Sequence, residues 1–172
     1  MTRTLASLAS LILLFLAASC PAQTAADSST TTCTIDDSRE ISIDFQPVAF
    51  DVKKHVLGKE IPFGKVWAPG GKPMALFTNT PIVAGNTNLP IGAYTLFIIP
   101  DEHSWTLIIS KSTDTSGKYN EKDDLARVKM QVGALTRPEE KFSAYFAHVA
   151  PTECNIRLDL QRDRAWTSFF VN

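Results

Sequence analysis

Three histidines and two neighbouring carboxylates carry the side chains best suited to acid–base or metal chemistry. They are His55, His103 and His148, with Asp101 and Glu102 beside the second histidine. Imidazole and carboxylate groups are ordinary zinc ligands, and they also serve as general acids and bases. His103 lies in a polar turn and His148 near the end of an expected strand, where solvated histidines are common. We therefore expect no metal site, and a hydrolase using Asp101, Glu102, His103 or His148 is the alternative interpretation.

Short catalytic and cofactor-binding motifs are absent from the sequence. It contains no Gly-x-Ser-x-Gly, no His-Glu-x-x-His, no glycine-rich phosphate loop before Lys-Ser/Thr, and no Cys-x-x-Cys. The acidic stretch 114–124 lacks the oxygen ligands of a calcium loop, because Ser116 stands where Asp or Asn is expected. The sequence therefore predicts no cofactor, although these absences exclude only the motifs named.

A loop rich in glycine and proline, residues 68–73, follows Trp67 and is the expected ligand-facing surface. Glycine lets a backbone approach a partner closely, and a tryptophan supplies flat contact area for a sugar ring or a peptide. Flanking lysines could hold an anionic group. The candidate ligand-binding residues are Trp67, Gly70, Gly71, Lys72 and Lys65. Tyr94, Trp105 and Trp166 belong with Trp67 to one set of candidate platform aromatics. Core packing is the alternative role of the set, and it is favoured for Tyr94 and Trp105, which lie on the apolar face of the hairpin described next.

A β-hairpin must position the group formed by Asp101, Glu102 and His103. Residues 93–99 and 105–109 are almost all β-branched, aromatic or leucine, and the turn formers gather between them. One alternating face carries Tyr94, Leu96, Ile98, Trp105, Leu107 and Ile109. The opposite face is nearly as apolar, so we expect this hairpin inside a β-sandwich or under a second layer.

Alternating apolar residues predict further short strands and no helix after the leader. They cover residues 41–45, 74–78, 82–83, 125–132, 142–148, 155–160 and 166–171. Residues 46–62 are broken by glycine and proline and are expected to form a loop. The predicted fold is a single-domain, all-β, mostly antiparallel sandwich of about eight or nine strands over residues 34–172.

The beginning of the chain is typical of an export signal. Arg3 precedes the apolar residues 11–16 and a small-residue exit. The signal ends either at residue 19, leaving Cys20 for lipidation, or at residue 22 after a small-x-small site. Both cleavages remain open. Residues 20–33 are rich in Ser and Thr and are expected to form a flexible tether.

The charge of the chain limits its possible partners, and its cysteines indicate a disulfide. Its net charge is −1 with basic and acidic residues interspersed, which excludes the basic stripe of a nucleic-acid-binding protein. Membrane association is expected only through a lipid on Cys20. In an oxidising compartment Cys33 and Cys154 remain as a pair, and we expect them to form a disulfide. Two independent thiols are the alternative.

Several of these segments, taken in order, resemble one known family. They are Gly64-Lys-Val-Trp67, Leu89-Pro-x-Gly-x-Tyr-x-Leu-Phe97, Trp105-Thr-x-Ile108 and Leu125-x-Arg-Val-Lys129. This set resembles the DUF2911 family, bacterial exported proteins of unknown function. The chain departs from the family pattern after Trp67, where Ala68-Pro-Gly-Gly-Lys-Pro73 replaces the usual Arg and Gly-Ala-Asn-Glu-like run. The resemblance implies export and says little about chemistry. If the loop after Trp67 is a family site, this chain has altered it.

The sequence as a whole favours an exported, non-catalytic binding or structural module of the bacterial cell envelope. A β-sandwich that presents loops is a common recognition scaffold, and no catalytic constellation is evident. The expected partner is a cell-envelope glycan or protein. The alternative is the extracytoplasmic hydrolase with a His/carboxylate site.

Overall fold

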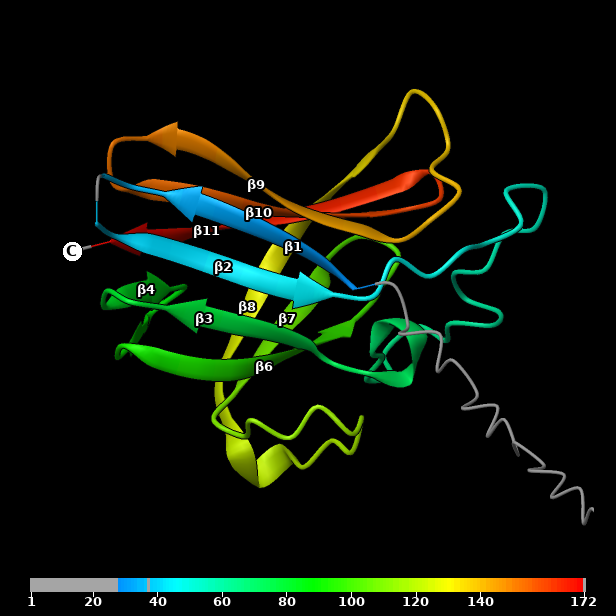
Figure 1. Ribbon diagram of the computed structural model, residues 1–172. Helices are drawn as coiled ribbons and strands as arrows, with labels where there is room; N and C mark the ends of the chain where they lie inside the picture. Colours follow the sequence, from blue (N-terminus) through cyan, green and yellow to red (C-terminus); the bar gives the residue numbers. More distant parts are fainter. Residues whose placement is uncertain (1–27, 37, 172) are drawn as a thin grey trace, which may run out of the picture.

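Figure 1 shows the computed structural model, which describes residues 28–36 and 38–171. The strands are β1 (Ser29–Thr34), β2 (Glu40–Phe45), β3 (Met74–Thr78), β4 (Ile82–Ala84), β5 (Thr87–Leu89), β6 (Gly92–Ile99), β7 (Trp105–Ser110), β8 (Asp124–Ala134), β9 (Ser143–Ala150), β10 (Glu153–Leu160) and β11 (Asp163–Val171). Two short 3-10 turns, η1 (Pro69–Gly71) and η2 (Glu121–Asp123), are the only helical segments described. The all-β prediction is confirmed.

All strand pairs are antiparallel, in the order β1-β2-β3-β6-β7-β8-β11-β10-β9. The long strand β8 pairs with β7 through its first part and with β11 through its last residues. The short hairpin of β4 and β5 attaches to the end of β11. The sheet curls until its edges β1 and β9 lie side by side (Figure 1), where the Phe146 amide donates to Thr31 Oγ1 at 3.1 Å. The result is a sheet nearly closed into a barrel.

The predicted hairpin forms the pair β6 and β7 in the middle of this order. Leu96 lies opposite Ile109, and their face is fully buried in the core. The other face is also buried, because the segment between β7 and β8 lays the Tyr119 ring edge-on against Phe97, with centroids 5.1 Å apart. Both apolar faces are therefore covered, as the sequence predicted.

The predicted disulfide is present, joining Cys33 on β1 to Cys154 on β10. Both cysteines are buried within the core cluster. The bridge links the first strand to the second-last strand, 121 residues away.

The start of the domain is a correction to the sequence prediction. Residues 29–33 were expected in the tether, but they belong to β1, which pairs with β2 along its whole length. Threonine is a good strand former, and backbone pairing with β2 together with the buried Cys33 compensates for the low apolar content. The signal peptide, Cys20 and the tether up to residue 27 lie outside the described residues.

Residues 46–62 form a loop without a helix or strand, as predicted, and this loop is a cap over one end of the barrel. Val56, Leu57 and Ile61 are buried in the core, and the Ile61 amide donates to the Val56 carbonyl at 3.0 Å. Gln161, in the turn between β10 and β11, holds this cap in place. Its side-chain oxygen accepts from the Val56 amide at 3.1 Å, and its amide group donates to the carbonyls of Asp51 and Lys54.

Gln161 has a positive φ of 53°, which makes its replacement informative. We expect Gln161→Ala to lower the free energy of unfolding by about 2 kcal/mol, because buried hydrogen bonds to the cap are lost. Gln161→Gly loses the same bonds but tolerates the positive φ, so it should be milder by about 1 kcal/mol. Urea unfolding compares the two variants, and faster hydrogen exchange at Val56 reports the loosened cap. Equal losses in both variants would contradict backbone strain at this position.

Candidate functional site

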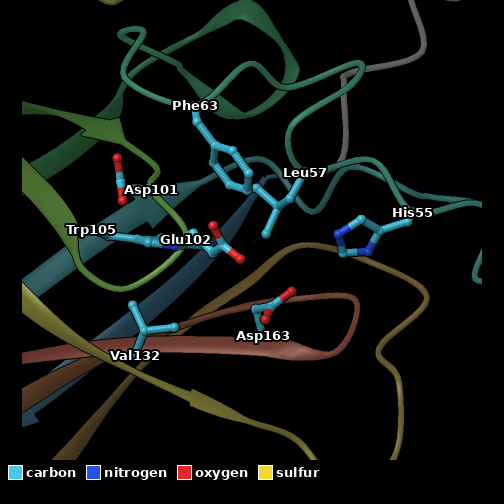
Figure 2. A pocket seen from close by; sticks show the side chains of 8 residues that line it. All are labelled: His55, Leu57, Phe63, Asp101, Glu102, Trp105, Val132 and Asp163. Carbon is cyan, nitrogen blue, oxygen red and sulfur yellow. The ribbon is translucent and has the colours of Figure 1, made fainter.

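The capped end of the barrel contains a small pocket of about 210 Å³ (Figure 2). Its lining residues are His55, Leu57, Phe63, Asp101, Glu102, Trp105, Val132 and Asp163. Figure 2 shows Phe63 and Leu57 on one side of the opening, and Asp163 and Val132 across from them. The pocket therefore combines four titratable groups with an apolar wall.

Three parts of the chain place the titratable groups. Asp101 and Glu102 follow β6 in the tight turn that leads to Trp105, which is 1% exposed and anchors the turn in the core. Asp163 is the first residue of β11. His55 belongs to the cap, next to the Val56 amide that Gln161 holds. The site thus depends on the hairpin, the β10–β11 turn and the cap together.

The charge of the pocket is negative. Three carboxylates line it with one histidine, and no Lys or Arg side chain is among its lining residues. Burial raises the pKa of Asp163 above its usual range, and the nearby His55 charge partly opposes this shift. A partly desolvated carboxylate in a negative pocket favours a cationic group as its partner.

The pKa of Asp163 gives a prediction about stability and pH. A raised pKa means that the folded protein holds the proton more tightly, so this stabilisation is present at acid pH and is lost as pH rises through the folded-state pKa. We therefore expect Asp163→Asn to increase the free energy of unfolding near neutral pH, with the gain shrinking toward about pH 3. Urea unfolding at several pH values between neutral and about pH 3 measures the gain in stability, and an NMR titration of the Asp163 carboxyl measures its pKa.

Asp114 provides a matched control for Asp163. Hydrogen bonds from the Ser116 backbone and side chain lower the pKa of Asp114, which is exposed. Asp114→Asn should therefore act in the opposite direction near neutral pH. An Asp163→Asn variant that is less stable than the natural protein at neutral pH and equal to it in acid would contradict a raised pKa of Asp163.

The pocket does not contain an assembled catalytic pair. Within the described part of the chain, no hydrogen bond joins His55 to a carboxylate, and no group of three metal-binding side chains is close enough to hold one ion. His103 is not among the lining residues, and its backbone amide makes a long contact of 3.5 Å to Asp101.

The two predicted histidines outside the cap do not join the site. His103 is exposed in the hairpin turn. His148 is exposed on β9 opposite Cys154, whereas the pocket lies beyond the Leu160 end of β10. At 3.3 Å per residue, these two ends of β10 are about 20 Å apart. Of the predicted acid and base residues, only Asp101 and Glu102 reach the pocket.

A second hollow of about 510 Å³ adjoins the first and has the opposite charge. Its lining residues are Val52, Lys53, Lys54, His55, Pro138, Gln161 and Arg162. His55 lines both hollows. The capped end therefore presents an acidic hollow and a basic hollow on either side of one imidazole.

The glycine- and proline-rich loop after Trp67 makes mainly internal contacts. Trp67 is half-buried and packs edge-on against Phe142 with centroids 5.5 Å apart. A Cβ on Gly117 would lie 2.0 Å from the Gly71 carbonyl oxygen, so the close backbone approach is to another loop of this chain. A Cβ on Gly70 would meet Gln46 at 2.5 Å.

The two lysines of that predicted site remain exposed. Lys65 contributes to neither hollow of the capped end. Lys72 lines a separate, open depression of about 390 Å³ together with Phe77 and Thr115. Trp67 packs on Phe142, whereas Lys65, Gly70, Gly71 and Lys72 are exposed. Of these, Lys72 lines the depression.

The sequence did not predict that Asp163 and Phe63 line the same pocket as the hairpin turn. Asp163 reads as part of a polar turn, and Phe63 follows a proline in a segment with no clear period. His55 was considered only as one of three histidines. Neither spacing nor residue type marks these residues as neighbours, because they meet only when the cap docks on the barrel end.

The described residues contain no helix long and apolar enough to cross a membrane. A family model for DUF2911, described as a protein of unknown function, matches residues 26–168. Searches of curated proteins and of solved structures each found no match. The matched segment covers most of the 172 residues and all strands up to the last residues of β11. The chain therefore belongs to the DUF2911 family.

Proposed function

We propose that this protein is an exported, non-catalytic binding module of the bacterial cell envelope, acting in the periplasm, at the outer membrane or outside the cell. The export signal expected from the sequence supports this location, and the disulfide is compatible with an oxidising extracellular compartment. The ligand site in this proposal is the capped end of the barrel. Its ligand is a small molecule that carries both an amine and an acidic group.

The observation that carries the proposal is the pair of oppositely charged hollows that share His55. An amine fits among Asp101, Glu102 and Asp163, and an acidic group fits beside Lys54 and Arg162. Phe63, which is 39% exposed, offers apolar contact at the rim. Short envelope peptides have this bipolar chemistry, since they carry free amines and carboxylates.

Isothermal titration with peptidoglycan stem-peptide fragments tests the proposal on the mature protein. Blocking the ligand amine by acetylation should weaken binding, and so should Glu102→Gln or Lys54→Ala, each about five-fold, as expected for a partly exposed ion pair. Lys72→Ala is the matched control, because Lys72 is a similarly exposed lysine outside both hollows. Loss of binding in Lys72→Ala with retention in the other variants would move the site to the loop after Trp67.

The hydrolase remains the second candidate, favoured by one observation. Asp163 has a raised pKa and lies in the same pocket as His55, and perturbed carboxyls of this kind occur at catalytic sites. Mass spectrometry of the fragments after incubation separates the two functions. Unchanged fragments that still bind support the module, and cleavage that Asp163→Asn abolishes supports the hydrolase.

A further inference from the structure

A second surface, on the outside of the barrel, has the chemistry of a sugar-binding site. It is a groove of about 210 Å³ over β8, β10 and β11. Its lining residues are Gly85, Lys129, Gln131, Asn155, Trp166, Thr167, Ser168 and Phe170. None of them lines the two hollows at the capped end.

The groove exists because β11 changes its neighbour. It pairs with β8 up to Trp166, opposite Gln131, and with β4 from Phe169, opposite Ala84. Between these points Thr167 and Ser168 have no partner strand on that side within the described sheet. Alternate residues of an antiparallel strand direct their backbone groups to opposite sides, and β10 pairs with β11 at both positions, so one of these two residues directs its N–H and C=O into the gap. Those groups can bond a ligand hydroxyl.

Trp166 forms a supported platform in this groove. A Cβ on Gly133 would lie 3.2 Å from the indole ring, so the glycine lets the ring lie against β8. The ring is half-buried, and its remaining surface lines the groove beside Phe170, which is 42% exposed. A flat aromatic ring that is fixed from behind loses little conformational freedom when it contacts a ligand.

Polar groups around the platform are oriented before any ligand arrives. Asn155, which is 8% exposed, donates from its amide group to Ser168 Oγ at 3.3 Å and accepts from Arg157 Nε at 3.0 Å. Ser168 in turn donates to Glu153. Asn155 therefore lines the groove with its amide group held in one orientation, and this group can donate two hydrogen bonds.

The charge of the groove selects among sugars. Lys129 is the one charged residue among the lining residues, and no carboxylate lines the groove. We propose that this groove binds an acidic pyranose unit of a glycan, with the ring against Trp166, hydroxyls on Asn155 and on the backbone in the gap beside β11, and the carboxylate near Lys129. The small volume fits one sugar unit and not a folded partner.

The test uses uronic-acid oligosaccharides and their neutral counterparts with the whole mature protein. The chain has three tryptophans, and Trp105 is buried while Trp67 packs on Phe142. The indole NMR signal of Trp166, assigned with Trp166→Phe, should therefore shift on binding. We expect Trp166→Ala to weaken binding at least ten-fold and Lys129→Gln about five-fold. Neutral oligosaccharides should bind about as weakly as the acidic ones bind to Lys129→Gln.

Two controls keep the result interpretable. Phe77→Ala removes a similarly exposed aromatic from β3 and should leave binding unchanged. Trp166→Phe still covers Gly133, so it tests the platform if the alanine variant fails to fold. Absence of binding, an unmoved Trp166 signal, or equal binding of neutral and acidic sugars would overturn the proposal.

Discussion

Removal of the disulfide between Cys33 and Cys154 is expected to lower the free energy of unfolding by about 4 to 5 kcal/mol on the chain-entropy model. The bridge spans 121 residues and therefore restricts most of the unfolded chain. It also ties β1, at one edge of the sheet, to β10 near the other edge. We expect the double variant Cys33→Ala/Cys154→Ala to unfold at markedly lower urea concentration, as measured by circular dichroism.

Reduction of the natural protein is the matched comparison. Dithiothreitol should shift its unfolding toward that of the double variant, and it should leave the double variant unchanged. Both cysteines are almost fully buried, so reduction should require opening of the barrel edge. A double variant as stable as the oxidised natural protein would contradict this prediction. Rapid alkylation of both thiols in the untreated native protein would contradict the disulfide itself.

The ion pair between Asp159 and Arg164 should have the next largest effect. Both guanidinium bonds to the carboxylate are 2.7 Å, and the Asp159 side chain is only 4% exposed. Arg164 also lies over the Tyr145 ring at 5.4 Å, and the bond to Asp159 raises the pKa of Arg164. We expect Asp159→Ala to lower the free energy of unfolding by about 3 kcal/mol, because it leaves a partly buried guanidinium without its partner. Urea unfolding measures the loss.

The double variant Asp159→Val/Arg164→Met distinguishes the loss of the ion pair itself from the cost of leaving one charge unpaired. It removes both charges, so it should recover most of the stability lost in Asp159→Ala. Glu121, which is 77% exposed and pairs with Arg127 at 3.0 Å, provides the surface comparison. Glu121→Ala should cost less than about 1 kcal/mol and its effect should fade in high salt. Equal costs at Asp159 and Glu121 would contradict the buried-pair prediction.

Residues on the outer face of β10 show how far alternation can predict burial. The sequence places Ile156, Leu158 and Leu160 on one face of the strand, and all three are fully buried. Alternation also places Asp159 on the opposite face, which sequence reasoning treats as solvated. Asp159 is nevertheless buried, because Arg164 from β11 and its contact with Tyr145 from β9 cover it. Cover of this kind depends on neighbouring strands and not on the strand itself.

The sequence by itself determined the local elements of this protein. Side-chain alternation and turn residues determined the hairpin of β6 and β7 and the later strands, since these patterns depend on residues close together in the chain. Strand β1 could not be predicted from its own residues, because they are poor in apolar side chains. The strand forms through its pairing with β2 and its disulfide to β10, which depend on residues elsewhere in the chain. The even pair of cysteines predicted the bridge, and the tertiary structure showed which strands it joins.

Only the tertiary structure decided where the chemistry gathers. Val56 and Gln161 are 105 residues apart, yet their hydrogen bond docks the cap and brings His55 to the same pocket as Asp163. The groove at Trp166 likewise arises where β11 leaves β8 for β4. Both sites are set by strand order and by the docking of distant segments. A local periodic pattern carries no information about either, because it records which face of a strand is buried and not which other segment covers it.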